Sequence, residues 1–175
     1  MLALFLIISC NKNSKNNMDN SNIPLSNNQD TAKVIVDTAS VFQDNKIEEY
    51  HNNVITKGDA LSFTKLIIHY EEKSDYKELQ KYALIMADKY NSGDGCSQVF
   101  VNMVAMNNNN EYYDISDFAK INNKAKNEAL KYLEKGAKLN DIDCMSMLSD
   151  IYRNGIGVEK DVKKADELKR KIENL

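Results

Sequence analysis

The chain has 175 residues, of which 42% are hydrophobic and 28% charged, with six glycines and a single proline. This composition is typical of one globular domain and argues against a turn-rich β-sandwich, because helices need few of either breaker residue. The formal net charge of −3 argues against a general nucleic-acid-binding surface. No apolar run reaches the roughly 18 residues that a transmembrane helix needs.

The first ten residues have the pattern of a sorting signal. The apolar run 2–8 is too short to span a bilayer but has the length of the hydrophobic part of a secretory signal. It ends in Ile-Ile-Ser followed by Cys10, which resembles the bacterial lipobox. The resemblance implies a lipoprotein signal peptide at 1–9, lipid attachment at Cys10 and anchoring to a membrane of the cell envelope. The alternative is an ordinary apolar N-terminus in which the cysteine occurs by chance.

The segment after the cysteine is rich in Asn and Ser. Residues 10–30 contain almost no apolar side chains, so they bury too little surface to offset the entropy of ordering. We therefore expect a flexible tether over 10–30 and a helical domain over 31–175. Within that domain, residues 33–42 are ambiguous, because the run Val-Ile-Val suits a strand as well as a helix.

The helical domain shows a repeat. We expect helices over 46–55, from Gly58-Asp59 through 70, and over 75–90, where Glu78 is placed for a capping box with Asp75. Toward the C-terminus three residues recur with a spacing of 36, which is typical of stacked helical units: Ala129, Tyr132 and Lys135 return as Ala165, Leu168 and Lys171.

The segment 144–165 carries the most specific motif. It resembles the Sel-one-like repeat, a relative of the tetratricopeptide repeat, although the family's usual first-helix glycine is replaced by Ser149. The resemblance implies an all-α fold of antiparallel helix pairs, about six to eight helices stacked as a short solenoid. The residues that match and carry structural roles are Leu148, Tyr152, Gly155, Gly157, Asp161 and Ala165.

Each of these positions has a physical reason. Leu148 and Tyr152 share one apolar helix face. Gly155 stands where a helix ends and a left-handed residue is favoured, and Gly157 permits a tight reversal. Asp161 is placed to cap the next helix, and Ala165 is small where two helices approach closely. A phosphate cradle is the weaker interpretation, because no Gly-Lys-Ser/Thr follows the glycines.

Catalytic and metal-binding patterns are not found in the sequence. His51 and His69 lie in no nucleophile motif, and no paired cysteines have metal-ligand spacing. Cys96 and Cys144 precede similar helices 48 residues apart, so we expect two small buried packing residues at corresponding places of successive units, too far apart for a disulfide. We expect no enzyme activity, no cofactor, no metal and no nucleic-acid partner.

A twelve-residue insertion, 107–118, interrupts the repeat and holds Tyr112, Tyr113 and Phe118. Aromatic residues in loops often anchor a partner, so these three are the candidate binding residues. The alternative is that the rings fold back and cover the neighbouring groove. Both remain open at the level of sequence.

The function expected from the resemblance is a membrane-tethered, non-enzymatic protein-protein interaction module of the bacterial cell envelope, with an unknown protein or peptide as partner. Two alternatives are an inhibitor or immunity-type protein and a hydrolase directed at the cell wall or β-lactams. The second is the weaker, because members of the repeat family linked to β-lactams are rich in paired cysteines and this chain has only three cysteines.

Overall fold

All elements of the described part of the chain are helical. The computed structural model describes residues 46–109 and 112–175, and no strand occurs among them. The all-helical prediction is therefore confirmed for these residues. The predicted signal peptide 1–9, Cys10, the tether 10–30 and the ambiguous segment 33–42 lie outside the described residues.

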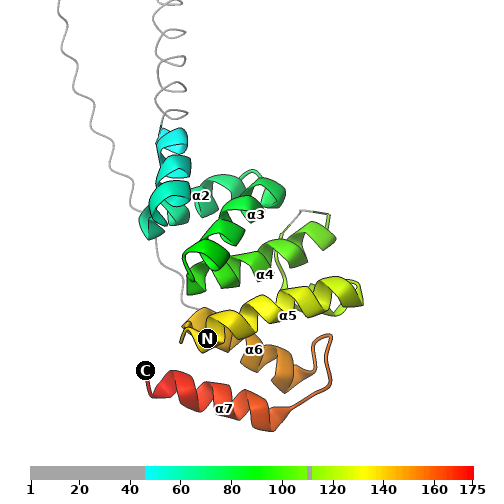
Figure 1. Cartoon of the computed structure of the whole chain (residues 1–175). Helices are drawn as coiled ribbons and strands as arrows, with labels where there is room; N and C mark the ends of the chain where they lie inside the picture. The colour runs from blue at the N-terminus through cyan, green and yellow to red at the C-terminus, as the bar shows by residue number, and fades with distance from the viewer. Residues whose placement is uncertain (1–45, 110–111) are drawn as a thin grey trace, which may run out of the picture. The chain divides into compact units, whose positions relative to one another are not determined.

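The helices pack in chain order, each against the next (Figure 1). The described residues begin with a helix over 46–57, and α2 spans Ala60–Glu71. The remaining elements are α3 (Tyr76–Leu84) with the π-helical turn η1 (Ile85–Lys89), α4 (Gly93–Asn107), the 3-10 helix η2 (Ile115–Ala119), α5 (Asn123–Lys138), α6 (Ile142–Asn154) and α7 (Val162–Glu173).

Short polar side chains begin each α-helix from α2 to α7. In every case the side chain of the preceding residue accepts a backbone N–H three residues on, which satisfies a donor that the helix leaves unpaired. These N-caps are Asp59, Asp75, Ser92, Asn122, Asp141 and Asp161. Each cap fixes the residue at which its helix begins.

Two details of α3 differ from the sequence prediction. The capping box is only half formed, because Glu78 pairs with Lys81 while the Asp75 N–H donates to the carbonyl of Tyr70. The continuous helix expected over 75–90 also ends at Leu84 and continues as the π-helical turn η1. There the Ser92 N–H donates to the Met86 carbonyl at 3.0 Å, so the chain leaves the helix with a wider final turn.

One core runs through the described helices. It is formed by fully buried side chains from every helix between α2 and α7, among them Phe63, Leu79, Phe100, Leu133, Ile151 and Ala165. Burial of this apolar surface stabilises the fold by roughly 25 cal/mol for each Å² removed from water.

The connection between α6 and α7 contains two glycines with positive φ. Gly155 ends α6 with a φ of 68°, and Gly157 has a φ of 67°. A β-carbon on Gly157 would lie 3.1 Å from the Cα of Ala119, so the loop passes close to the end of η2. Asp161 then accepts the Lys164 N–H and begins α7.

A lysine–carbonyl contact occurs three times along the described chain. Each time a lysine ammonium donates to a backbone carbonyl near the C-terminal end of an earlier helix, where the helix dipole favours a positive charge. The pairs are Lys89 with Ile55 at 2.7 Å, Lys135 with Ala87 at 2.7 Å and Lys171 with Ala137 at 2.8 Å. Donor and acceptor are 34, 48 and 34 residues apart.

Candidate binding surface around α5

The three aromatic residues predicted to bind a partner are not equally available. Tyr112 is 56% exposed, whereas Phe118 is fully buried. The Phe118 ring lies 5.2 Å from the ring of Phe100 in α4, and Tyr113 meets the same ring edge-on at 6.2 Å. The structure therefore corrects the sequence prediction for Phe118, which folds back into the core, and leaves Tyr112 as the accessible ring.

The two described cysteines are buried and free. Burial raises the pKa of the Cys96 thiol to about 11 and also raises that of Cys144, so neither is activated as a nucleophile. Both side chains pack against Gly136 of α5, since a β-carbon placed there would lie 3.1 Å from the β-carbon of Cys96 and 2.9 Å from that of Cys144.

The positions of the two cysteines do not correspond as the sequence comparison suggested. Cys96 lies four residues after its N-cap Ser92, while Cys144 lies three residues after Asp141. The two side chains therefore reach Gly136 from helix positions that differ by one residue, and α4, α5 and α6 meet at this glycine.

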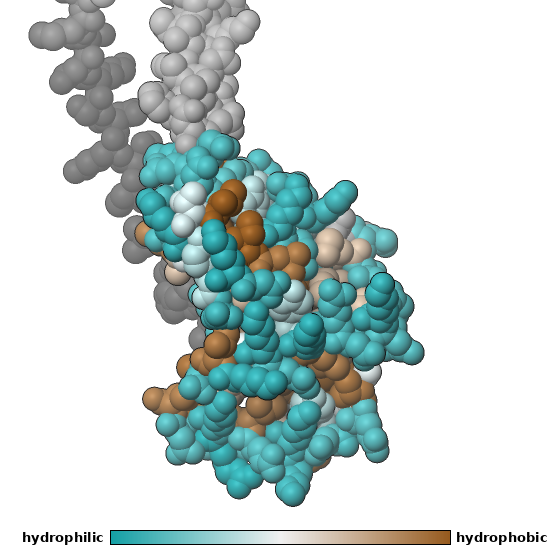
Figure 2. Space-filling view, viewed as in Figure 1, coloured by the Kyte–Doolittle hydropathy of each residue, from teal (hydrophilic) through white to brown (hydrophobic). Residues whose placement is uncertain are grey.

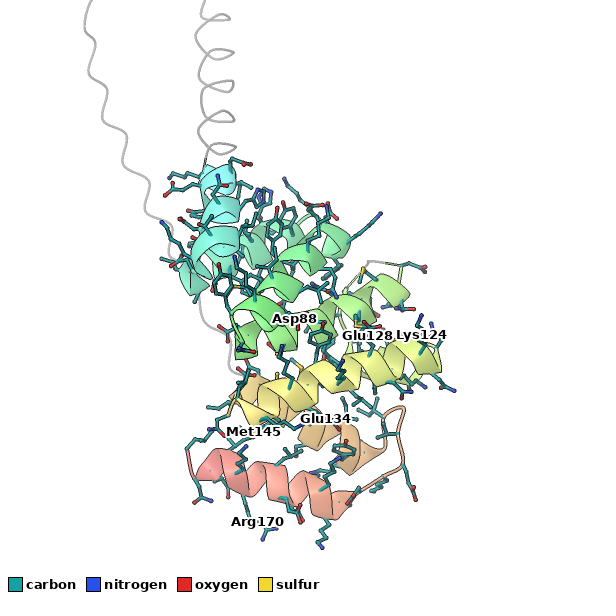
Figure 3. All side chains as sticks on the ribbon, viewed as in Figure 1. Asp88, Lys124, Glu128, Glu134, Met145 and Arg170 are labelled. Carbon is teal, nitrogen blue, oxygen red and sulfur yellow. The ribbon has the colours of Figure 1, made fainter. Side chains whose placement is uncertain are left out.

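A ridge of charged side chains runs along the exposed side of α5. Lys131, Glu134, Lys135 and Lys138 follow one another at helical spacing, and Figure 3 shows Glu134 projecting toward α7. Hollows lie on both sides of this ridge. The first, here called the Asp88 cavity, has a volume of about 330 Å³ and is lined by Asp88, Lys131, Tyr132, Glu134, Lys135 and Lys138.

A charged cluster lines the Asp88 cavity. Lys135 donates to Asp88 at 2.9 Å, and the Tyr132 hydroxyl donates to the same carboxylate at 2.9 Å. Burial disfavours the Asp88 charge, but these hydrogen bonds outweigh it and lower the pKa of Asp88. The charges of Asp88 and Lys135 therefore neutralise each other. Part of the lining of this cavity thus serves to hold α5 against η1.

The second hollow is here called the α5–α7 groove. It has a volume of about 370 Å³ and is lined by Glu134, Ala137, Lys138, Leu148, Lys164, Leu168 and Lys171. Its floor is apolar, and its rim carries three lysines and one glutamate. In Figure 2 hydrophobic atoms are visible between the helices of this region and are bordered by hydrophilic ones.

Contacts within the groove hold two of the rim lysines. The Lys164 ammonium donates to the Tyr152 hydroxyl at 2.6 Å and lies 4.0 Å from Glu134. The hydrogen bond to Tyr152 raises the pKa of Lys164, so its charge persists well into the alkaline range. Lys171 is held by the Ala137 carbonyl. By contrast, Lys138 is exposed and makes no hydrogen bond or ion pair with the described residues.

The described residues contain no assembly for metal binding. No group of three or more His, Cys, Asp or Glu side chains among residues 46–109 and 112–175 could hold an ion. Within the same ranges, none of the helices is both long and apolar enough to cross a bilayer. The ring of His51 stacks against that of Tyr82 at 4.7 Å, and its Nε2 lies 2.7 Å from the Tyr70 hydroxyl.

Sequence reasoning did not find the α5–α7 groove. A signal was present, because Leu168 and Lys171 were recognised as repeat positions, but the groove forms only when α5, α6 and α7 come together. Comparisons with models of protein families, with characterised proteins and with solved structures find no match for this chain.

Proposed function

We propose that this chain is a membrane-tethered, non-enzymatic protein-interaction module of the bacterial cell envelope, built from Sel-one-like helix pairs stacked as a short solenoid. The repeated lysine–carbonyl contacts support the stacked arrangement. Two of the three span 34 residues, and the third, at 48, spans the insertion that follows α4. A constant contact between successive units is typical of a repeat protein.

The observation that carries the binding function is the α5–α7 groove. An open hollow with an apolar floor and a charged rim suits the contact of a partner side chain. Neither of the two described thiols lines the groove, and burial raises the pKa of both, so neither is an activated nucleophile. The surface is therefore better suited to binding than to a reaction.

The membrane tether rests on Cys10 alone. If Cys10 is acylated, the protein should partition into detergent and incorporate a fatty-acid probe, because several acyl chains bind a bilayer far more firmly than one. The Cys10→Ser variant should lose the probe and become soluble. Probe incorporation that persists in Cys10→Ser would contradict the assignment.

The binding function is tested by affinity capture from envelope extracts with the full chain as bait, followed by mass spectrometry. We expect a partner recovered in stoichiometric amount. Tyr112→Ala should weaken its recovery and leave the melting temperature unchanged, because this ring is exposed. The matched control is Leu139→Ala, which removes an exposed apolar side chain at the C-terminal end of α5. Recovery of no stoichiometric partner would refute the proposed function.

A further inference from the structure

The floor of the α5–α7 groove is apolar and only partly filled. Leu148 and Ala137 are buried there, and Leu168 is half-buried beside them. The groove volume of about 370 Å³ is large enough to take an aliphatic or aromatic side chain. Such a side chain would cover Leu168 and remove its exposed surface from water.

The rim of the groove carries a net positive charge, whereas the protein as a whole is negatively charged. Three lysines and one glutamate surround the floor, while the chain as a whole carries a net charge of −3. An ammonium has three N–H donors. Lys171 uses one on the Ala137 carbonyl and Lys138 uses none on described residues, so both keep donors for an incoming carboxylate. Glu134 is offset by Lys164 at 4.0 Å.

The groove continues along α5. Glu134 and Lys138 belong to its lining and also to that of the Asp88 cavity, so the two hollows adjoin across the ridge. Lys131, another residue of the ridge, lines the Asp88 cavity but not the groove and adds another positive charge. This extended path favours a chain molecule over a compact ligand, because a compact ligand would fill one hollow only.

We propose that the α5–α7 groove binds an acidic peptide segment of a protein partner. One apolar side chain of the segment rests on Leu148 and Leu168, and neighbouring carboxylates pair with Lys138 and Lys171. The inference rests on the proposed function and adds the chemical class of the partner to it.

The direct test is a selection of short random peptides displayed on phage, with the full chain in detergent as the target. We expect the enriched peptides to carry a net negative charge and at least one large apolar residue. Their binding should weaken as the salt concentration rises, because charges at an exposed rim are screened. Replacing the apolar residue of a selected peptide by Ser should also weaken binding, which tests the floor without altering the protein.

The protein variant that tests the rim is Lys138→Glu, with Lys163→Glu as the matched control. Both residues are exposed lysines, so the change in net charge is identical, but Lys163 lines neither hollow. Lys138→Glu should weaken the selected peptides about tenfold or more, since it places a like charge beside their carboxylates. Lys163→Glu should bind as the unmodified protein does.

The peptide selection overturns the inference if it gives no enrichment, if it enriches neutral or basic peptides, or if Lys138→Glu and Lys163→Glu bind equally. Binding of phosphatidylglycerol vesicles but not phosphatidylcholine vesicles, abolished by Lys138→Glu in the absence of any selected peptide, would assign the rim to lipid and also overturn it. A stoichiometric partner whose capture is insensitive to Lys138→Glu would leave the proposed function standing and refute only this inference.

Discussion

Gly136 determines how closely three helices approach. It lies in the middle of the contact between α5, α4 and α6, with the side chains of Cys96 and Cys144 directly against its α-carbon. Because the site is fully buried, no solvent-filled space is available to take a larger side chain. Glycine destabilises a helix by about 1 kcal/mol relative to alanine. Its contribution at this position is therefore the absence of a side chain, which lets the two cysteines pack against the backbone.

Gly136→Ala should therefore destabilise the protein despite the better helix propensity of alanine. The added methyl group would overlap Cys144, and overpacking of this kind costs about 1–3 kcal/mol. The measurement is the free energy of unfolding in urea. The double variant Gly136→Ala with Cys144→Ala should recover part of the loss, because it removes the sulfur that the methyl group meets. An unchanged midpoint in Gly136→Ala would show that the helices can separate freely.

Gly155 acts through its backbone rather than its size. A β-carbon at this position would lie 3.3 Å from the β-carbon of Lys160, which is close but tolerable, whereas the φ of 68° is unfavourable for a branched residue. Gly155→Val should lose about 1–3 kcal/mol of unfolding free energy. Gly155→Asn is the control and should lose less, since Asn tolerates this conformation. Equal losses in the two variants would point to packing instead of backbone strain.

At the scale of the element, the sequence predicts what depends on neighbours along the chain. The end of α6 and the start of α7 follow from Gly155 and Asp161, whose conformations are local. No residue type in the sequence marks the π-helical turn η1 after α3, because its conformation depends on the packing of η1 against α4. Phe118 could not be placed either, since its environment is the ring of Phe100 from another helix.

The candidate site was less predictable than the fold for the same reason. The groove combines side chains from α5, α6 and α7, and its floor residue Leu148 is separated along the chain from Leu168. Periodicity marks both as apolar positions but does not tell whether a third helix covers them. The buried environment of both cysteines was expected, but the one-residue difference in their helix positions was not.

Lys171 links α7 to the end of α5, and its removal should loosen both. Lys171→Met keeps most of the apolar side chain and deletes the ammonium that binds the Ala137 carbonyl. We expect a loss of about 1 kcal/mol. Hydrogen exchange should become faster in the last turn of α5. Lys169→Met, on the same helix and exposed, is the control and should exchange as the unmodified protein does. Equal exchange in both variants would contradict the role of Lys171.

At the scale of the whole molecule, several buried or half-buried thiols and tyrosines make stability depend on pH in the same direction. Burial raises the pKa of Cys96 to about 11 and that of Tyr132 to about 12, and it raises the pKa values of Cys144, Tyr70 and Tyr113 as well. All five are neutral when protonated. The folded state therefore holds protons that the unfolded chain releases near pH 9 for the thiols and near pH 10 for the tyrosines.

The free energy of unfolding should be constant with respect to these groups below pH 9 and fall as the pH rises above it. In that range the unfolded chain binds fewer protons than the folded one, and a buried thiol such as Cys96 contributes a slope of about 1.4 kcal/mol per pH unit up to its folded pKa. Urea midpoints between pH 8 and pH 11 measure this decline. The variant Cys96→Ala with Cys144→Ala should postpone the onset to the tyrosine range. A midpoint that stays level up to pH 11 would contradict the prediction.

The lysine–carbonyl contacts also favour one order in which the helices unfold. Each one makes the end of an earlier helix dependent on a later one: Ile55 on Lys89, Ala87 on Lys135 and Ala137 on Lys171. When α7 detaches, α5 loses the donor at its last turn, and a frayed α5 holds η1 less firmly through Lys135. Unfolding that starts at α7 therefore weakens the contacts of the helices before it in turn. Unfolding of the helix 46–57, by contrast, removes the Ile55 carbonyl as an acceptor but none of the three lysine donors. A pulling force applied at residue 175 should accordingly open the described helices in sequence, beginning with α7.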